Sequence, residues 1–236
     1  MKVNFSILVY IQKPLNIDFS PNPLISSIYI IKVYIQNTVN KEVEKSMNKK
    51  PHLIDVQPIR SKEQIEDMKW ALKRHCSERD YILFLIGIHT GLRVSDLLQL
   101  ETQTILKLKR KKRKEFKIKE GKTKKERMIN LTSIFDEVYS YAQGIENTWL
   151  FPSRKGDQPI SKIQAYRQLQ KAGDFAGIES IGTHTMRKTF GYWFYKQTKD
   201  VAMLQEILNH STPQITLKYI GINKEEKDNI LDEFHL

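Results

Sequence analysis

The sequence predicts an α+β fold that is mainly helical and includes a small antiparallel sheet. Apolar residues recur at helical spacing through most of the chain after residue 60, often next to capping residues. Between Leu100 and Leu131 the pattern changes to alternation of apolar and polar residues, which is typical of half-buried strands. The chain has 236 residues, 40% of them hydrophobic, which suffices for one good-sized domain, or for one domain and an appendage.

A change in composition predicts a domain boundary near residue 46. Residues 1–46 are rich in Ile, Val, Asn and Tyr, whereas the sequence from Met47 onward is charged and regularly patterned. Three interpretations of residues 1–46 stay open: a strand-rich appendage, a disordered arm, or translation from an upstream start with Met47 as the native initiator. Their apolar runs are shorter than the roughly 20 residues of a membrane helix, and no cleavage pattern follows the first run. We therefore expect neither a membrane span nor a secretory signal.

The first expected elements are helices. Ser61, with Gln64 three residues later, is a capping signature that opens an amphipathic segment. A more buried helix follows at about 77–89, and Gly91 is expected to end it. The next short apolar face begins beside Arg93, so this arginine is expected at the start of a helix.

The expected sheet follows in the chain. Alternation in Glu115–Lys119 and in residues 127–131, with Gly121 in a turn between them, predicts an antiparallel hairpin. From Ser133 onward the periodicity is helical again. We expect helices at about 133–143, 161–176, 184–197, 200–209, 213–220 and 224–234, with connecting loops at 149–152 and 177–183.

Positive charge is concentrated in one segment. The chain has 39 Lys and Arg against 27 Asp and Glu, a formal net charge of +12. Residues 107–127, the basic run, contain 13 basic and 3 acidic side chains and so carry a net +10. Such charge attracts polyanions, nucleic acid first and anionic membrane second, and a solvated loop is the alternative. The side chains expected to contact DNA phosphates are Lys109, Arg110, Lys111, Lys112, Arg113, Lys124, Lys125, Arg127 and, outside the run, Lys188.

Metal and redox sites are not expected. Cys76 is the only cysteine, which excludes an intramolecular disulfide and a thiolate zinc cluster and indicates a reducing, intracellular setting. The histidines at 52, 75, 89 and 235 have no spacing that suggests a metal site. The aromatic cluster at residues 190–195 is expected to be core, because duplex DNA does not offer its bases for stacking.

One set of residues points to chemistry on phosphate. Tyr219 lies nine residues after His210, and His184 and Arg187 are one helical turn apart. A tyrosine oxygen can attack a phosphodiester when nearby cations hold the phosphate. Guanidinium groups such as those of Arg93 and Arg187 bind two phosphate oxygens in a planar fork. Each residue alone has an ordinary structural explanation, but their joint appearance predicts a DNA strand transferase.

Four motifs, in this order, resemble the tyrosine recombinase family, the phage-integrase type of site-specific recombinase. They are Thr90-Gly-Leu-Arg93-Val-Ser-Asp96, Gly121-Lys122-Thr-Lys-Lys-Glu-Arg127, Thr183-His184-Thr-Met-Arg187, and Leu208-Asn-His210 followed by Tyr219. The resemblance covers roughly residues 60–222. It implies a mainly helical catalytic domain at 47–222 with a three-stranded antiparallel sheet, and a tail at 223–236 that docks on a neighbouring protomer.

The resemblance also implies a role for each motif residue. Tyr219 would be the nucleophile that forms a 3′-phosphotyrosyl bond and releases a 5′-hydroxyl. Lys122 would protonate the leaving 5′-oxygen, and His184 would act as the base toward Tyr219. The residues implied in stabilising the transition state are Arg93, Arg187 and His210.

Asp96, three residues after Arg93, would orient that arginine. No ATP, metal or other cofactor is implied. The implied partner is double-stranded DNA, bound by a homo-tetramer on paired sites, with room for an accessory DNA-bending protein and without a membrane. The implied location is the cytoplasm, at the nucleoid.

The chain departs from the family pattern in three places. Asn209 stands where glycine usually precedes the histidine, which we expect to alter the local turn more than the chemistry. The excursion at residues 109–114 is longer than compact members need. The usual helical core-binding domain is missing, although short members such as the invertases that switch fimbrial promoters consist of little more than the catalytic domain.

Two other functions stay open. A type IB topoisomerase uses the same chemistry without site preference, although its larger size argues against it. A decayed, non-catalytic integrase-like module would bind DNA only, and the intact set of six candidate catalytic residues argues against decay.

Overall fold

The computed structural model describes residues 56–222 and residue 232, which belong to a compact unit spanning Asp55–Leu236. The expectations for residues 1–46, for the boundary there and for the helix at 224–234 lie outside the described residues, apart from Asp232. Among the described helices, none has the length and apolar character that crossing a membrane requires.

Capping residues start the first two described helices. Ser61 accepts a backbone N–H of the first turn at 3.2 Å and caps α3 (Lys62–His75), as its sequence signature predicts. The second helix, α4 (Glu78–Thr90), buries most of its side chains. It ends at Gly91, whose φ is 62° and whose Cβ would lie 2.3 Å from a ring carbon of Phe190, so the position requires glycine.

This helix stop positions the first candidate arginine. Arg93 is the N-cap residue of the four-residue helix α5 (Val94–Leu97), which confirms the expectation that it lies at a helix start. Its side chain is 16% exposed, so the turn after Gly91 directs a guanidinium into the molecule instead of into bulk solvent.

The sheet has two strands in the described part of the chain, so the expectation of three is wrong there. The strands β1 (Glu115–Lys119) and β2 (Glu126–Asn130) pair antiparallel, with Lys119 opposite Glu126 at the loop end. The stretch before β1 forms α6 (Thr102–Lys107) and the 3₁₀ helix η1 (Leu108–Arg110), which the sequence reasoning missed. Thr102, Ile105 and Leu108 are buried at a spacing of three, which favours a helix over a third strand.

The remaining elements agree with the predicted helices to within one or two residues. A short 3₁₀ turn, η2 (Thr132–Ile134), leads into the first of them. The helices are α7 (Phe135–Gln143), α8 (Lys162–Phe175), α9 (Thr185–Thr198), α10 (Val201–Leu208) and α11 (Pro213–Tyr219).

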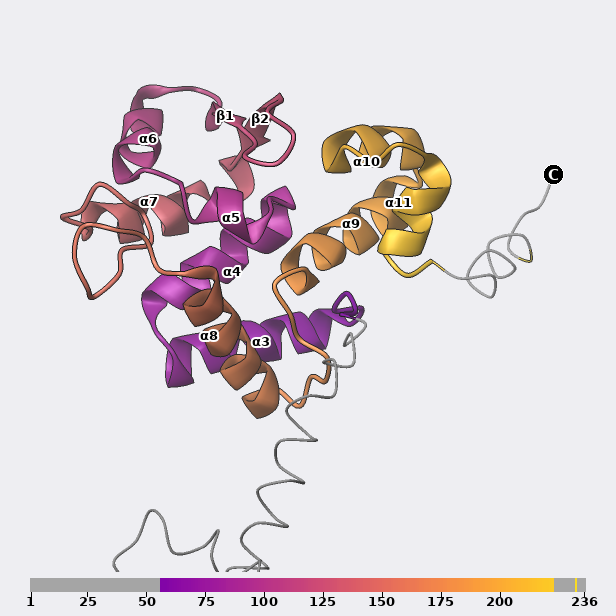
Figure 1. The fold of residues 1–236 in the computed structure, drawn as a ribbon, viewed down its shortest axis with the longest axis horizontal. Coiled ribbons are helices and arrows are strands. Elements are labelled where there is room, and N and C mark those ends of the chain that lie inside the picture. The colour runs from indigo at the N-terminus through magenta and orange to yellow at the C-terminus, as the bar shows by residue number, and fades with distance from the viewer. Residues whose placement is uncertain (1–55, 223–231, 233–236) are drawn as a thin grey trace, which may run out of the picture. The chain divides into compact units, whose positions relative to one another are not determined.

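Two hydrophobic clusters hold these elements together. The larger one is built on α3 to α8 and the hairpin, and the smaller one joins α9, α10 and α11 around Leu204, Leu208 and Ile220. The aromatic residues of α9 pack in or against the smaller cluster, which confirms their expected core role. Figure 1 shows α9, α10 and α11 as one group, with the hairpin beside α10. The candidate catalytic residues lie at the start of α5, in the hairpin loop and on or next to α9, α10 and α11.

Candidate active site

Tyr219 is the last residue of α11, and its hydroxyl lies beside a histidine from another helix. His184 Nδ1 is 3.1 Å from the Tyr219 hydroxyl oxygen, although the residues are 35 positions apart. The ring of His210 contacts the Tyr219 ring edge to face at 4.9 Å between centroids, and Lys188 Nζ lies 5.5 Å from the Tyr219 ring centre. The structure thus brings Tyr219 together with both candidate histidines.

His210 is held by the turn between α10 and α11. Asn209 ends α10 in the left-handed conformation, with φ 49°, and so occupies the backbone conformation that glycine would adopt there. The expectation that Asn209 alters the local turn more than the chemistry stays a prediction. The Nδ1 atom of His210 lies 3.1 Å from Oγ1 of Thr216, which is fully buried, and this contact fixes the ring toward the cleft.

Arg187 is buried at 2% exposure and spans two helix ends. Its NH1 donates to the carbonyl of Gly91, at the end of α4, and its NH2 donates to the carbonyl of Leu208 at 2.7 Å, at the end of α10. Carbonyls at helix C-termini carry partial negative charge, so they suit a guanidinium. These contacts join the two hydrophobic clusters at the candidate site.

Arg93 has a carboxylate partner that the sequence reasoning missed. Its NH1 donates to Glu120 Oε2 at 2.6 Å, and Glu120 is 2% exposed. Thr123 Oγ1 donates to the same carboxylate oxygen at 2.9 Å. Glu120 extends the alternation that turns Phe116 and Ile118 inward, which is the signal that could have located it.

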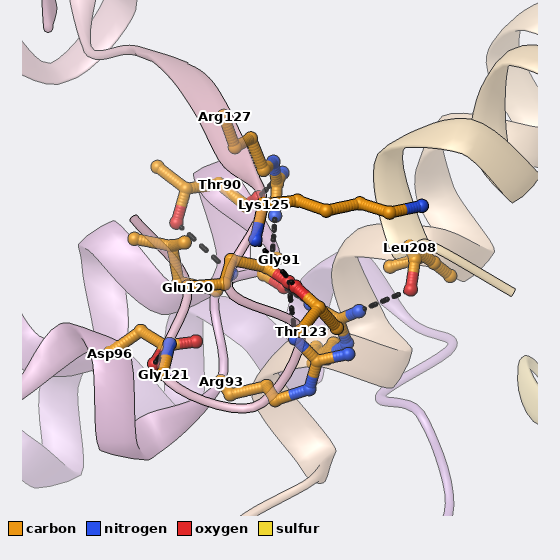
Figure 2. A network of polar contacts seen from close by, with 12 residues as sticks. Thr90, Gly91, Arg93, Asp96, Glu120, Gly121, Thr123, Lys125, Arg127 and Leu208 are labelled. Atoms are coloured by element: carbon orange, nitrogen blue, oxygen red, sulfur yellow. Dashed lines mark hydrogen bonds and ion pairs between the residues drawn. The ribbon is translucent and has the colours of Figure 1, made fainter. Parts of the chain in front are cut away.

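Asp96, the predicted partner of Arg93, contacts the hairpin instead. Its Oδ1 accepts the backbone N–H of Gly121 at 3.0 Å, and Figure 2 shows this contact beside the one between Arg93 and Glu120. Two carboxylate contacts therefore join the hairpin loop (residues 120–125) to the segment that carries Arg93. Glu120 of the loop accepts from Arg93, and Asp96 of the segment accepts from Gly121.

Lys122 lies in the hairpin loop and is exposed, without a hydrogen bond or ion pair to any residue that the structure describes. Its charge contributes to lowering the pKa of His184, which places the two in the same electrostatic environment. The loop also reaches α10, because Lys125 Nζ donates to Asn209 Oδ1 at 2.9 Å.

The basic run divides into exposed and inward-facing side chains. Exposed residues of the predicted DNA-binding set are Lys109, Arg110, Lys111, Lys112, Arg113, Lys124 and Lys125. Arg127 instead lies on the inward face of β2, with its side chain 15% exposed, and donates to the carbonyl of Thr90. Burial and the charge of Arg187 lower the pKa of Arg127 to about 10, so it stays protonated at neutral pH.

The site also shifts the pKa values of its titratable groups. Burial raises the pKa of Tyr219, although the charges of Arg187 and Arg93 and a hydrogen bond from Arg187 oppose this rise. Desolvation and the surrounding cations, Arg187 first, lower the pKa of His184 and of His210. At neutral pH the site therefore holds a neutral phenol beside neutral imidazoles.

A cleft of about 900 Å³ borders the site between the hairpin, α9 and α10. Its lining includes Glu120, Lys125, Arg127, Asn209 and His210. No group of three or more metal-ligating side chains occurs among the described residues. The polar lining mixes the cations Lys125 and Arg127 with three carboxylates, those of Glu120, Glu126 and Glu206. Tyr219 is not part of the lining, so the cleft reaches the candidate nucleophile through the ring of His210.

Comparisons with known proteins identify the family and the fold. The profile of the "Phage integrase family" matches residues 60–226. The "Probable integrase/recombinase YoeC" of Bacillus subtilis (strain 168) is 48% identical over 172 residues, which cover 72% of this chain and 92% of that protein. The fold resembles the crystal structure of XerA recombinase, with a TM-score of 0.61, 18% identity, and coverage of 80% of this chain and 68% of that one.

Two further structures contain DNA. The XerH site-specific recombinase, bound to a palindromic difH substrate as a post-cleavage complex, has a TM-score of 0.57 and 23% identity, over 75% of this chain and 53% of that one. A lambda integrase tetramer bound to a Holliday junction has a TM-score of 0.55 and 16% identity, over 69% of this chain and 47% of that one. At these identities the likeness shows the shared fold.

Proposed function

The chain belongs to the phage integrase family, and we propose that it is a site-specific DNA recombinase that breaks and rejoins strands through a covalent bond between Tyr219 and a DNA 3′-phosphate. The observation that carries this proposal is the position of the Tyr219 hydroxyl, 3.1 Å from His184 and beside the buried Arg187. Residues from three of the four motifs lie around this phenol: His184 and Arg187 as hydrogen-bond partners, His210 through a ring contact, and Arg93 through its charge.

In the first step the Tyr219 oxygen attacks phosphorus, and the bond from phosphorus to the 5′-oxygen breaks. The phenol is neutral at pH 7, as an ordinary tyrosine is, and burial raises its pKa further, so the attack needs a proton acceptor. The pKa of His184 is lowered, which favours the neutral imidazole that takes the phenolic proton. Lys122 gives a proton to the departing 5′-oxygen, which leaves as a hydroxyl.

Charge on the non-bridging oxygens is stabilised by the arginines. Arg93 and Arg187 donate to these oxygens, and His210 adds a neutral donor from the turn that carries it. In the second step the 5′-hydroxyl of a partner strand attacks the phosphotyrosine, which releases Tyr219. The phosphotyrosyl bond conserves the energy of the broken phosphodiester, so the cycle needs neither ATP nor a metal.

Binding to double-stranded DNA is assigned to the exposed part of the basic run, which supplies affinity and not base readout. Recombination of paired sites requires several copies of the chain, and we assign the tail at 223–236 to docking on a neighbouring protomer in a tetramer. Truncation after Ile222 should then leave cleavage intact and abolish synapsis of paired sites. Unchanged synapsis would contradict the docking role.

Mass spectrometry on a suicide substrate tests the proposed chemistry. The substrate is a nicked duplex that carries the repeats flanking the encoding locus, so that the 5′-hydroxyl diffuses away and the adduct accumulates. The wild-type protein should trap a 3′-phosphotyrosyl adduct at Tyr219, and Tyr219→Phe should trap none. An adduct that formed on Tyr219→Phe would overturn the assignment.

The same material separates the two alternatives. Relaxation of a supercoiled plasmid that lacks the site would favour a type IB topoisomerase activity. Binding of the site without any adduct, in the wild-type protein, would favour a DNA-binding module.

A further inference from the structure

We infer that Glu120 is the positioning residue of Arg93: its carboxylate holds one edge of the guanidinium so that the other N–H groups face the scissile phosphate. This inference rests on the proposed function, because the phosphate is the ligand that Arg93 would meet. Among the described residues, no other acceptor for the Arg93 guanidinium is found within hydrogen-bond distance. Since arginine has five N–H donors, the remaining ones are available to a ligand.

The contact has the geometry of a fixed pair. The distance from Arg93 NH1 to Glu120 Oε2 is 2.6 Å, and the two side chains are 16% and 3% exposed. Such a charge-assisted hydrogen bond is stronger and more directional than a pair on the surface. Thr123 adds a second donor to the same oxygen at 2.9 Å, so the carboxylate itself is oriented.

Glu120 is ionised in this environment. Burial by itself would raise its pKa, but the hydrogen bonds from Arg93 and Thr123 and the charges of Arg93 and Arg187 hold the pKa below its ordinary value. Its other oxygen, Oε1, lies 3.7 Å from Arg127 NH1 and has no hydrogen-bond partner among the described residues. One carboxylate therefore lies among three guanidinium groups, as Figure 2 shows for Arg93 and Arg127.

This balance of charges favours orientation over binding as the function of Glu120. A carboxylate next to the phosphate site weakens the attraction for DNA, because it cancels one of the positive charges there. Its benefit is the fixed direction of Arg93, which matters in the transition state more than in the encounter with DNA. Removal of the Glu120 carboxylate should therefore lower the cleavage rate without lowering the affinity for DNA.

The backbone links this carboxylate to the loop that carries Lys122. The Glu120 N–H donates to the Lys125 carbonyl at 3.0 Å, and the Glu120 carbonyl accepts from the Lys124 N–H at 2.9 Å. The neighbouring Gly121 is held by Asp96. Arg93 and the hairpin loop are thus fixed to each other by Glu120 in one direction and by Asp96 in the other.

The first test compares Glu120→Gln with wild type in single-turnover cleavage of the suicide substrate at saturating DNA. The cleavage rate should fall by about 10- to 100-fold, the cost of a misplaced catalytic group, while the dissociation constant for DNA stays equal or decreases. The matched control is Glu146→Gln, which removes the same charge from an exposed position in the loop after α7 and should cleave at the wild-type rate. A wild-type rate for Glu120→Gln, or a parallel fall in DNA affinity, would overturn the inference.

Two further variants keep the test independent of folding and show that Glu120 acts through Arg93. Thr123→Val keeps the carboxylate but removes one of its donors, and it should lower the rate in the same direction by a smaller factor. In an Arg93→Lys background, Glu120→Gln should cost much less than in wild type, because the group it orients has been replaced. Equal costs in both backgrounds would contradict the inference.

Nuclear magnetic resonance of the arginine side chains separates this inference from the proposed function. The Arg93 Nε–H signal should be sharp in wild type and in Glu146→Gln, and broadened in Glu120→Gln, with no DNA present. If wild-type protein formed no adduct, the proposed function would fail, and this signal would still decide whether Glu120 holds Arg93. An Arg93 signal unchanged in Glu120→Gln would reject the positioning role.

Discussion

At the scale of single residues, the site pairs a phenol that resists ionisation with an imidazole that resists protonation. Burial produces both effects, because it disfavours the phenolate of Tyr219 and the imidazolium of His184 alike. Arg187 lies near both groups. Its positive charge opposes the rise in the pKa of Tyr219 and adds to the fall in the pKa of His184. A proton transfer from Tyr219 to His184 is therefore poorly favoured at rest. It becomes favourable as the Tyr219 oxygen bonds to phosphorus, because this bond makes the phenolic proton acidic.

The pH dependence of cleavage follows from this pair. A base must be neutral, so the cleavage rate should fall as the pH drops through the pKa of His184. At subsaturating DNA the pH dependence of the rate reports this pKa in the protein without DNA. Because that pKa is lowered from 6.5, the midpoint of the acid limb should lie below 6.5. Single-turnover cleavage between about pH 5 and about pH 8 measures it.

Two substitutions check which group titrates. His184→Gln should lower the cleavage rate by about 10²- to 10⁴-fold and remove the acid limb. His75→Gln, on α3 and stacked against Phe175, should keep both the rate and the limb. A midpoint at or above 6.5, or a limb that persists in His184→Gln, would contradict the role of His184 as base.

Residue types and spacing were sufficient to select the candidate nucleophile and its histidines, since Tyr219, His184 and His210 do meet. They were not sufficient to pair Arg93 with its carboxylate. Asp96 is closer to Arg93 in the sequence, but the partner is Glu120, 27 residues away on the hairpin. Local spacing cannot rank such partners, because the choice depends on how the hairpin packs against the turn after α4.

At the scale of elements, the turn between α10 and α11 connects the hairpin to the end that carries the nucleophile. Asn209 does two things that glycine would not do together. It adopts the left-handed conformation at φ 49°, and its side chain accepts a hydrogen bond from Lys125 in the hairpin loop. The element that carries Lys122 is thereby held against the one that leads to Tyr219.

Substitution at Asn209 separates these two contributions. Asn209→Gly keeps the turn and removes the hydrogen bond with Lys125, and it should cost about 0.5–1.5 kcal/mol of the free energy of unfolding, with the lower end expected for an exposed hydrogen bond. Asn209→Ala should cost about 1 kcal/mol more, because alanine is strained in the left-handed region. Urea denaturation measures both.

A double-mutant cycle supplies the control for this hydrogen bond. Lys125→Met in the Asn209→Gly background should add little, since the partner of Lys125 is already absent. Full additivity of the two changes would show that the hydrogen bond between the hairpin and the turn contributes nothing in solution.

Element prediction succeeded where one pattern was continuous and failed where two competed. The helices from α7 to α11 have regular periodicity, side chains cap the N-termini of α8, α10 and α11, and all of them appear at the expected positions. The segment before β1 has helical spacing inside a region that otherwise alternates, so α6 was missed. The third strand, which the family resemblance implied, is absent from the described residues. The alternation of buried and exposed side chains along β1 continues to Glu120, and on β2 it turns Arg127 inward, although Arg127 was expected to contact DNA phosphates.

At the scale of the whole molecule, the charge is distributed over both ends of the hairpin. Lys122, Lys124 and Lys125 lie in its loop, whereas residues 109–113 precede β1 at the opposite end. A five-residue strand is about 16 Å long, so the two groups lie about one strand length apart. This separation suits phosphates several nucleotides apart on one duplex and leaves the reactive phosphate near the loop.

The salt dependence of DNA binding tests whether residues 109–113 bind phosphates. Each bound phosphate releases counterions, so replacing all five basic side chains with glutamine should reduce the slope of log K against log salt by up to about 0.9 for each phosphate no longer bound, or about 4.5 in all. Arg113 also pairs with Glu115 at 3.0 Å, but this exposed pair is too weak to withhold the arginine from DNA. The matched control replaces Arg154 and Lys155, which are exposed in a different loop, and should leave the slope unchanged. A slope for the fivefold variant equal to that of wild type would mean that the segment is a solvated loop, and that the DNA phosphates are bound around the hairpin loop and Lys188.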